Sequence, residues 1–210
     1  MLLAIDTSAG TAVAAVDGDR VLAERSSGDT MRHAEAIGSL IRDTLAHAGR
    51  EPTAVVAGMG PGPFTGLRVG IAAARAFAFG RGIPVLPLVS HDAIAFEHLE
   101  RESRGGPGTS GALRDLLVVT DARRRERYWS RYEGLTPEGV PHRVAGPGLA
   151  KPGGLPTAVE TVEAAVVSAA ALGLLAERHR SAGVPFEEPQ PLYLRSPDVT
   201  LPARRKRVTR

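Results

Sequence analysis

The chain has 210 residues, of which 43% are hydrophobic and 23% charged, a composition typical of a globular protein large enough to bury a substantial core. The absence of cysteine excludes disulfides, thiolate metal sites and a thiol nucleophile, and no apolar run reaches membrane-spanning length, so we expect a cytoplasmic protein without membrane contact. The net charge of +3 depends on a basic C-terminal tail, because the rest of the chain is slightly acidic; the basic residues of the tail are Arg204, Arg205, Lys206, Arg207 and Arg210.

The N-terminal residues predict a three-stranded meander. Apolar and partly β-branched stretches predict strands at Leu2–Ile5, Thr11–Val16 and Arg20–Arg25. Asp17-Gly18-Asp19 supplies the backbone freedom that a tight hairpin needs between the last two strands. The turn Asp6-Thr7-Ser8 places a carboxylate and two hydroxyls at the end of the first strand.

A helix, a strand and a glycine-dense loop come next. Apolar residues recur at helical spacing over Met31–Ala48, and Ala54–Ala57 predicts a buried strand. The loop Gly58–Gly70 then leads into a second helix. It fits neither common nucleotide fingerprint, because Pro63 stands where the third glycine of the dinucleotide pattern belongs and no Gly-Lys-Ser/Thr ending follows. The loop therefore indicates either tight strand-to-helix packing or a phosphate cradle of another type.

One face of the second helix, Thr65–Gly80, carries only small side chains. Gly66, Gly70, Ala74 and Ala78 repeat at intervals of four residues, so another backbone can approach closely along this face. The spacing leaves open whether a neighbouring element of the same domain or a second protein makes that approach.

The chain continues with a predicted strand over Ile83–Leu88 and a helix over Ser90–Glu100, with Ser90 as the expected cap. Arg101–Gly111 is charged and then rich in glycine and proline, which makes it the best candidate for a domain boundary.

The second half predicts two strands and a helix. Leu116–Val119 predicts a strand that leads to Asp121, and the alternation over Glu126–Tyr132 predicts the next strand. Many prolines and glycines leave the path of Gly134–Pro156 open. Val162–Arg180 predicts the last helix, and the residues from 189 onward are expected to be extended.

Arginines alternate with aromatic residues around the second of these strands. Arg123, Arg124 and Arg127 lie beside Tyr128 and Trp129, a mixture that can bind RNA through charge and base stacking. A structural hairpin with Arg127 and Trp129 on one face and Tyr128 on the other explains the same alternation. The basic tail, residues 197–210, leaves a similar choice between contact with nucleic-acid phosphates and a solvated, disordered end.

Five motifs occur in the order seen in one protein family. They are Ile5-Asp6-Thr7-Ser8, Arg32-His33-Ala34-Glu35, the Gly58–Gly70 loop, Asp121-Ala122-Arg123 and Tyr193-Leu194-Arg195. Over nearly the whole chain this series resembles the TsaB (YeaZ) family of bacterial tRNA threonylcarbamoyladenosine biosynthesis proteins. The resemblance implies an α/β fold of the actin-like ATPase (ribonuclease H-like) class, with mixed sheets flanked by helices in two lobes, residues 1–104 and residues 112–196.

The resemblance also implies partners. Proteins of this family are non-catalytic relatives of TsaD, the threonylcarbamoyltransferase; they form a heterodimer with TsaD, which the ATPase TsaE joins, and the assembly modifies the adenosine beside the anticodon of tRNA. ATP or ADP and the metal are then expected on the partner subunits, with no cofactor on this chain. The sequence does not decide between a homodimer and a heterodimer, since the small-residue face of the second helix could serve both. The interface is expected on the two N-terminal helices; its candidate residues are His33, Ile37, Ile41, Gly66, Gly70, Ala74, Phe77 and Ala78.

In TsaD, two histidines four residues apart on a helix bind the metal. The spacing of the histidines in this chain tests whether it could bind a metal in the same way. Here Ile37 stands four residues after His33. His91 and His98 are seven residues apart, which is roughly 10 Å along a helix and too far for one metal ion. We therefore assign no metal ligands from the sequence.

The carboxylates allow a second test, since Asp6 and Asp121 end the first strands of the two lobes. Together with Thr7 and Ser8 they are the candidate nucleotide-binding residues, and a small ATPase with its site between Asp6 and Asp121 is the alternative function. The second lobe offers no Gly-Gly turn before a helix of the kind that binds adenosine in such ATPases, since Pro156 soon follows Gly153-Gly154. This argues against a complete nucleotide site.

Overall fold

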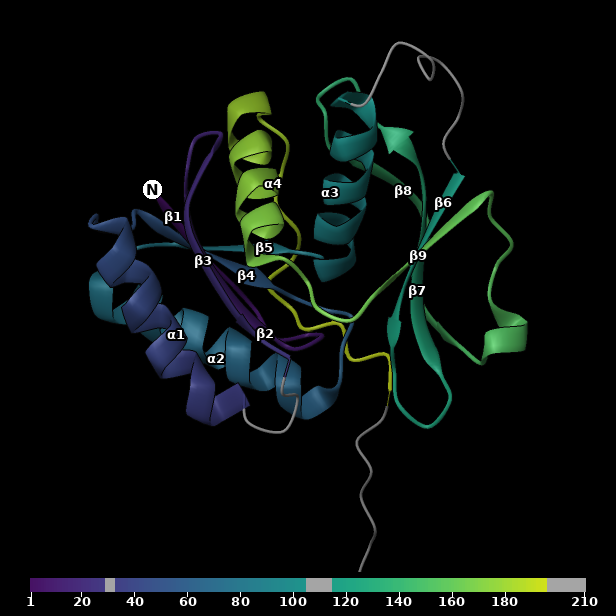
Figure 1. The fold of residues 1–210 in the computed structure, drawn as a ribbon, viewed down its shortest axis with the longest axis horizontal. Coiled ribbons are helices and arrows are strands. Elements are labelled where there is room, and N and C mark those ends of the chain that lie inside the picture. Colours follow the sequence, from purple (N-terminus) through teal and green to yellow (C-terminus); the bar gives the residue numbers. More distant parts are fainter. Residues whose placement is uncertain (29–32, 105–114, 196–210) are drawn as a thin grey trace, which may run out of the picture.

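The computed structural model describes residues 1–28, 33–104 and 115–195, and these residues form two mixed sheets and four α-helices (Figure 1). The strand order is β3-β2-β1-β4-β5 in the first sheet and β8-β7-β6-β9 in the second. Helices α1 and α2 cover the outer face of the first sheet, while α3 and α4 pack against each other between the two sheets (Figure 1).

The first sheet contains the predicted meander and two parallel strands. Its strands are β1 (Leu2–Asp6), β2 (Thr11–Asp17), β3 (Arg20–Ser27), β4 (Ala54–Gly58) and β5 (Val85–Leu88). β2 pairs antiparallel with both β1 and β3, whereas β4 pairs parallel with both β1 and β5. The predicted meander and the predicted strands on either side of the second helix are therefore confirmed.

The second sheet is formed by the second half of the chain. Its strands are β6 (Asp115–Asp121), β7 (Arg127–Leu135), β8 (Pro141–Ala150) and β9 (Glu160–Ala164), and a 3-10 turn at Pro152–Gly154 follows β8. β7 pairs antiparallel with β6 and β8, and β9 pairs parallel with β6. The stretch whose path the sequence left open thus forms the end of β7, all of β8 and the turn after it.

The helices are α1 (His33–Ala48), α2 (Phe64–Arg81), α3 (Ser90–Arg104) and α4 (Ala169–Ala182). Residues 31 and 32 of the first predicted helix lie outside the described residues. α3 continues about one turn beyond its predicted end at Glu100.

The prediction of one helix over Val162–Arg180 is wrong at its start. Val162 lies in β9, where it pairs in parallel register with Val118 of β6, so the need for a strand beside β6 overrides the helical pattern of these residues. The helix begins only after Ser168, whose side chain accepts a hydrogen bond of 3.0 Å from the backbone N–H of Ala171.

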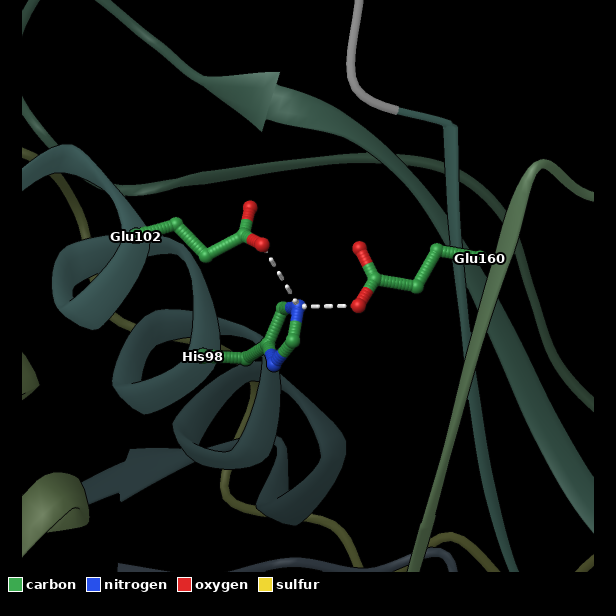
Figure 2. A group of neighbouring side chains, drawn as sticks. All are labelled: His98, Glu102 and Glu160. Atoms are coloured by element: carbon green, nitrogen blue, oxygen red, sulfur yellow. Dashed lines mark ion pairs between the residues drawn. The ribbon is translucent and has the colours of Figure 1, made fainter. Parts of the chain in front are cut away.

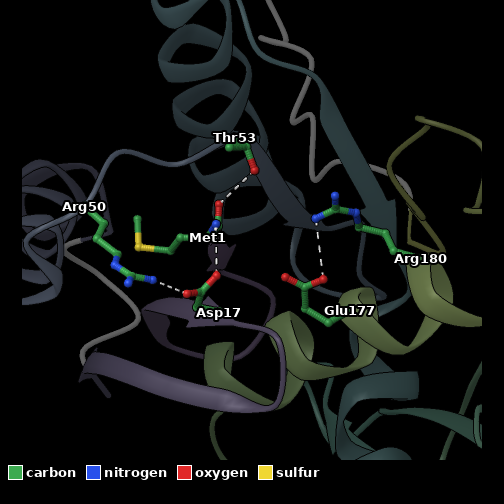
Figure 3. Close-up of polar contacts among 6 residues, drawn as sticks. All are labelled: Met1, Asp17, Arg50, Thr53, Glu177 and Arg180. Carbon is green, nitrogen blue, oxygen red and sulfur yellow. Dashed lines mark hydrogen bonds and ion pairs between the residues drawn. The ribbon is translucent and has the colours of Figure 1, made fainter.

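β1 is buried on both faces, as its continuous apolar sequence predicts. Leu2 and Ala4 join the core between the sheets, while Leu3 and Ile5 join the core beneath α1 and α2. At the start of β1, Thr53 donates hydrogen bonds to the carbonyl oxygen of Met1 from its backbone N–H and its hydroxyl (Figure 3).

The hairpin between β2 and β3 is held by the start of β1. The Met1 amino group lies 3.3 Å from Asp17, which also pairs with Arg50 (Figure 3). On the neighbouring helix α4, Glu177 and Arg180 form an ion pair of 3.5 Å (Figure 3). The contacts of Met1 thus join the start of β1 to the β2–β3 hairpin and to the segment before β4.

α4 packs on the first sheet although it follows the second sheet in the sequence. Gly173 lies directly against β2, and a Cβ atom at this position would be 2.6 Å from Cγ2 of Val16. α3 ends at Arg104, and residues 105–111 of the predicted boundary lie outside the described residues. The division into lobes 1–104 and 112–196 therefore stays a prediction, with α4 crossing from the second range to the sheet of the first.

Within residues 1–28, 33–104 and 115–195, none of the helices has the length and apolar character needed to span a bilayer.

The first turn of α3 is joined to the second sheet by buried polar contacts. The two ring nitrogens of His91 lie 2.9 Å from the hydroxyls of Ser130 and Thr120, and the hydroxyl of Tyr132 donates a 2.7 Å hydrogen bond to Asp92. Burial lowers the pKa of His91 to about 3 and raises the pKa of Asp92 to about 6, the latter against the opposing charge of Arg143. The contributions of His91 and Asp92 to the free energy of unfolding therefore change with pH in opposite directions.

We predict that His91→Gln and Asp92→Asn change the pH dependence of stability with opposite signs. Between pH 6.5 and about 3, unfolded His91 binds a proton that the folded side chain does not, so it lowers stability as the pH falls. Between about pH 4 and 6, folded Asp92 keeps a proton that the unfolded side chain loses, so it lowers stability as the pH rises. Denaturant titrations at pH 6.5 and 4.5 measure both effects.

His91→Gln is expected to reduce the stability lost between these two pH values by about 2 kcal/mol, whereas Asp92→Asn is expected to increase that loss. Ala46→Gln, on the exposed side of α1, replaces no titratable group and serves as the control, which should leave the dependence unchanged. Equal pH dependence in the wild type and both variants contradicts the prediction.

Candidate functional site

The carboxylate of Asp6 is buried at the carboxyl end of β1 and is fully hydrogen bonded. Its Oδ1 accepts hydrogen bonds from the backbone N–H and the hydroxyl of Ser8, at 2.8 and 2.6 Å, and its Oδ2 accepts one from the hydroxyl of Ser90 at 2.5 Å. Burial raises the pKa of Asp6, and the hydrogen bonds from Ser8 and Ser90 lower it. The side chain that the sequence proposes as a nucleotide ligand is thus held by its own chain.

The glycine loop lies directly on this strand end. A Cβ atom at Gly58 would collide with the carboxylate of Asp6, and one at Gly62 would lie 2.8 Å from Cα of Ser8. The backbone N–H of Gly60 donates a 3.0 Å hydrogen bond to the Ser90 hydroxyl. Ser90, the first residue of α3, therefore joins the loop to Asp6, and its predicted role as the cap of this helix stays a prediction.

The small-residue face of α2 packs on the same turn. The hydroxyl of Thr7 donates to the carbonyl oxygen of Gly66 at 2.7 Å and accepts from the backbone N–H of Gly70 at 3.1 Å. A Cβ atom at Gly66 would lie 2.8 Å from the carbonyl oxygen of Thr7, and one at Gly70 would lie 2.9 Å from its Cγ2. Ala74 and Ala78, the other small residues of this face, are buried as well. The element that approaches the small-residue face of α2 is therefore a part of the same chain.

The eight candidate interface residues fall into two groups. Ile41 and Phe77 are partly exposed beside the core under α1 and α2. The other six are buried within this chain: His33, Ile37, Gly66, Gly70, Ala74 and Ala78. His33, for example, lies with its Nδ1 2.7 Å from the hydroxyl of Thr11. The six buried residues can hold the two helices in position, but an interface with a partner would have to use other, exposed side chains of these helices.

The outward side of α2 supplies such side chains. Ala72, Arg75, Ala76 and Phe79 are exposed at helical spacing, and Phe79 is 90% exposed. Figure 1 shows α1 and α2 side by side on this outer face of the first sheet. The sequence did not indicate Phe79, because the four-residue repeat of small residues marks the buried face of α2 and Phe79 lies on the opposite face.

Asp121 differs from Asp6 in its surroundings. Its side chain is 64% exposed at the end of β6 and accepts a 2.7 Å hydrogen bond from Arg127, which also pairs with Glu163 of β9 at 3.3 Å. Arg127 thus links three strands of the second sheet. These contacts join Asp121 and Arg127 to each other and to Glu163, and none of them involves Asp6.

The β6–β7 turn holds Arg123, Arg124 and Arg125 in the left-handed region, with φ of 61°, 51° and 61°. This conformation costs a residue other than glycine on the order of 1 kcal/mol or more. Arg123 and Arg124 are exposed, and along β7 Tyr128 is buried while Arg127 and Trp129 are partly exposed. The two faces predicted for this hairpin are confirmed, and contact of the arginines with RNA stays a prediction.

The segment after α4 crosses from the glycine loop to the β6–β7 turn. The backbone N–H of Leu192 donates to the carbonyl oxygen of Met59 at 2.8 Å, the ring of Tyr193 packs on that of Phe64 at 4.8 Å, and Arg195 donates to the carbonyl oxygen of Ala122 at 3.1 Å. The Tyr193-Leu194-Arg195 motif thus joins the loop to the second sheet. The basic tail of residues 197–210 lies outside the described residues.

We predict that Gly70→Ala destabilises the protein by about 1–3 kcal/mol, because the new methyl group collides with Thr7 and has no room to move. Gly80→Ala, in the same helix, is the matched control: no atom lies within 4 Å of the added Cβ, so stability should stay equal or rise slightly. Denaturant unfolding measures both variants. Thr7→Ala combined with Gly70→Ala should recover part of the loss, and an unchanged stability of Gly70→Ala alone contradicts this packing.

Known proteins resemble the chain in sequence. A family model described as TsaD, tRNA N6-adenosine threonylcarbamoyltransferase, matches residues 21–156, which is more than half of the chain. An uncharacterised protein of Mycobacterium leprae is 43% identical over 160 residues, covering 72% of this chain and 39% of the relative. The tRNA threonylcarbamoyladenosine biosynthesis protein TsaB of Escherichia coli is 31% identical over 135 residues, covering 63% of this chain and 54% of the relative. The chain thus spans less than two thirds of the length of these relatives.

The solved structure of YeaZ from Pseudomonas aeruginosa has the same fold, with a TM-score of 0.73 at 24% identity, covering 92% of this chain and 99% of that one. Together with the two mixed sheets and their helices, this likeness confirms the predicted actin-like α/β fold class. The family model shows that the chain belongs to the TsaD-type family, and the TsaB relatives and the YeaZ fold agree with its TsaB (YeaZ) motif series.

Proposed function

We propose that this chain is the scaffold and activator subunit of the bacterial complex that transfers a threonylcarbamoyl group to the adenosine next to the anticodon of tRNA. In this role it binds a TsaD-like catalytic partner through α1 and α2, and a TsaE-like ATPase joins the pair. The assembled complex binds tRNA in the cytoplasm. The observation that carries the proposal is the exposed apolar surface of α2 in a chain whose relatives include TsaB.

The outer side of α2 suits a protein partner. An exposed ring at Phe79 and the flat surface formed by Ala72 and Ala76 allow a helix of another protein to pack closely beside it. A large exposed aromatic side chain is typical of the residues that contribute most to binding, and the preceding helical turn places Arg75 and Ala76 beside it. Ile41 and Phe77, partly exposed between the helices, extend the same apolar surface toward α1.

The end of β1 supports a role without catalysis by this chain. Asp6 is surrounded by Ser8, Ser90 and Gly58, so a metal or phosphate ligand has to displace these groups before it reaches the carboxylate. On the proposal, nucleotide and metal are held by the partner subunits. The alternative, a small ATPase with a site between Asp6 and Asp121, requires both carboxylates to give up their present contacts.

We predict that Phe79→Asp weakens binding to a TsaD-like partner at least about tenfold, because it places a charge in an apolar contact. Val159→Asp is a matched control, since Val159 is 88% exposed, as Phe79 is at 90%, but lies in the second half of the chain, just before β9. Calorimetric titration of the partner with each variant measures the difference. Equal affinities for the two variants place the interface elsewhere.

Reconstitution of tRNA modification tests the activator role itself. Transfer by the TsaD-like and TsaE-like subunits should require this chain, and Phe79→Asp should lower the rate while Val159→Asp leaves it unchanged. Full activity without this chain refutes the role. Magnesium-dependent ATP turnover by the purified chain, lost on Asp6→Asn, would support the ATPase instead.

A further inference from the structure

Three potential metal ligands meet where α3 passes β9. Figure 2 shows the side chains of His98 and Glu102 on α3 and of Glu160 on β9 pointing toward one another. Nε2 of His98 lies 2.9 Å from Oε1 of Glu160 and 3.8 Å from Oε1 of Glu102, and one donor atom from each residue lies within 4.8 Å of the others. None of the three belongs to the surface proposed for partner binding.

His98 has an unusual position for a histidine that only forms ion pairs. Its side chain is 16% exposed, and its Nε2 atom is buried. In the described part of the chain this nitrogen makes no hydrogen bond, although it forms an ion pair with Glu160 at 2.9 Å. A buried nitrogen without a hydrogen bond costs free energy, and coordination to a cation removes that cost.

The separations of the donor atoms fit a transition metal. Zinc binds histidine nitrogen and carboxylate oxygen at about 2.0–2.2 Å, so tetrahedral geometry places two donors about 3.4 Å apart. The distances from Nε2 to the two carboxylates, 2.9 and 3.8 Å, lie on either side of that value. His98 and Glu102 are four residues apart and share one face of α3, while Glu160 approaches from the strand.

Charge favours the same ligand. A neutral imidazole with two carboxylates carries a charge of −2, which one divalent cation neutralises. The nitrogen donor favours Zn²⁺ or a similar ion over Mg²⁺ and Ca²⁺, which prefer oxygen ligands.

We propose that His98, Glu102 and Glu160 bind one divalent transition-metal ion, for which Zn²⁺ is the best match, with water completing its coordination. The ion ties α3 to β9, and thus the helix that follows the first sheet to the edge of the second. The site is independent of partner binding by α1 and α2, so the two proposals stand or fall separately.

Metal titration of the full-length chain tests the site. The protein is prepared without a histidine tag and treated with chelator, and Zn²⁺ is then added in a calorimeter. We expect one ion per chain in the wild type, with affinity at least about tenfold lower in His98→Gln and Glu160→Gln, since each removes a direct ligand. His47→Gln, an exposed histidine on α1, is the matched control and should bind as the wild type does.

Thermal unfolding gives a second readout. At a free Zn²⁺ concentration 100-fold above Kd, Tm of the wild type should rise by about 5 to 10 °C, while His98→Gln should show little change. If either variant fails to fold, X-ray absorption of the zinc-loaded wild type decides, because the site requires one imidazole and otherwise only oxygen ligands. Binding that is absent, present only at millimolar Zn²⁺, or unaffected by the loss of His98 and Glu160 overturns the proposal.

Discussion

The close contact between the end of β1 and the loop-helix unit after β4 is the constraint on which the first sheet and its outer helices depend. The backbone of this unit reaches the turn Asp6-Thr7-Ser8 because Gly58 and Gly70 carry no side chain where a Cβ atom would collide with Asp6 and Thr7. The approach buries the carboxylate of Asp6, which then needs hydrogen-bond donors, and Ser8 and Ser90 supply them. α2 is thereby fixed against β1, and the direction of its outer surface is fixed with it.

Much of the first sheet could be predicted from the sequence because the informative residues are neighbours in the chain. The Asp17-Gly18 turn, the apolar strands and the glycine loop each follow from local rules, and the structure confirms them. The four-residue spacing of Gly66 and Gly70 correctly predicted a close backbone approach to α2. It could not identify the approaching element, since periodicity describes one face of a helix and contains no information about Thr7, some sixty residues earlier.

The second sheet was harder to predict because its contacts join distant residues. Val162 was placed in a helix on local pattern, yet its place in the fold depends on pairing with Val118. The same reason applies to His98: the sequence shows no second histidine at a suitable spacing, and Glu160 meets it only after α3 and β9 pack together. Ligand sets that combine a helix with a strand from another part of the chain leave no local pattern to find.

The two sheets share one apolar core, and this bears on how a scaffold subunit works. Leu2 and Val56 of the first sheet belong to the same buried cluster as Val118 and Tyr132 of the second, with α3 and α4 between them. Separating the sheets exposes that core to water at roughly 25 cal/mol for each Å² of apolar surface. A surface that does not move on binding loses little conformational entropy, so more of its contact energy appears as affinity. On the proposed function, Phe79 lies on a helix that β1 holds in place, so its contact with a partner would cost little conformational entropy.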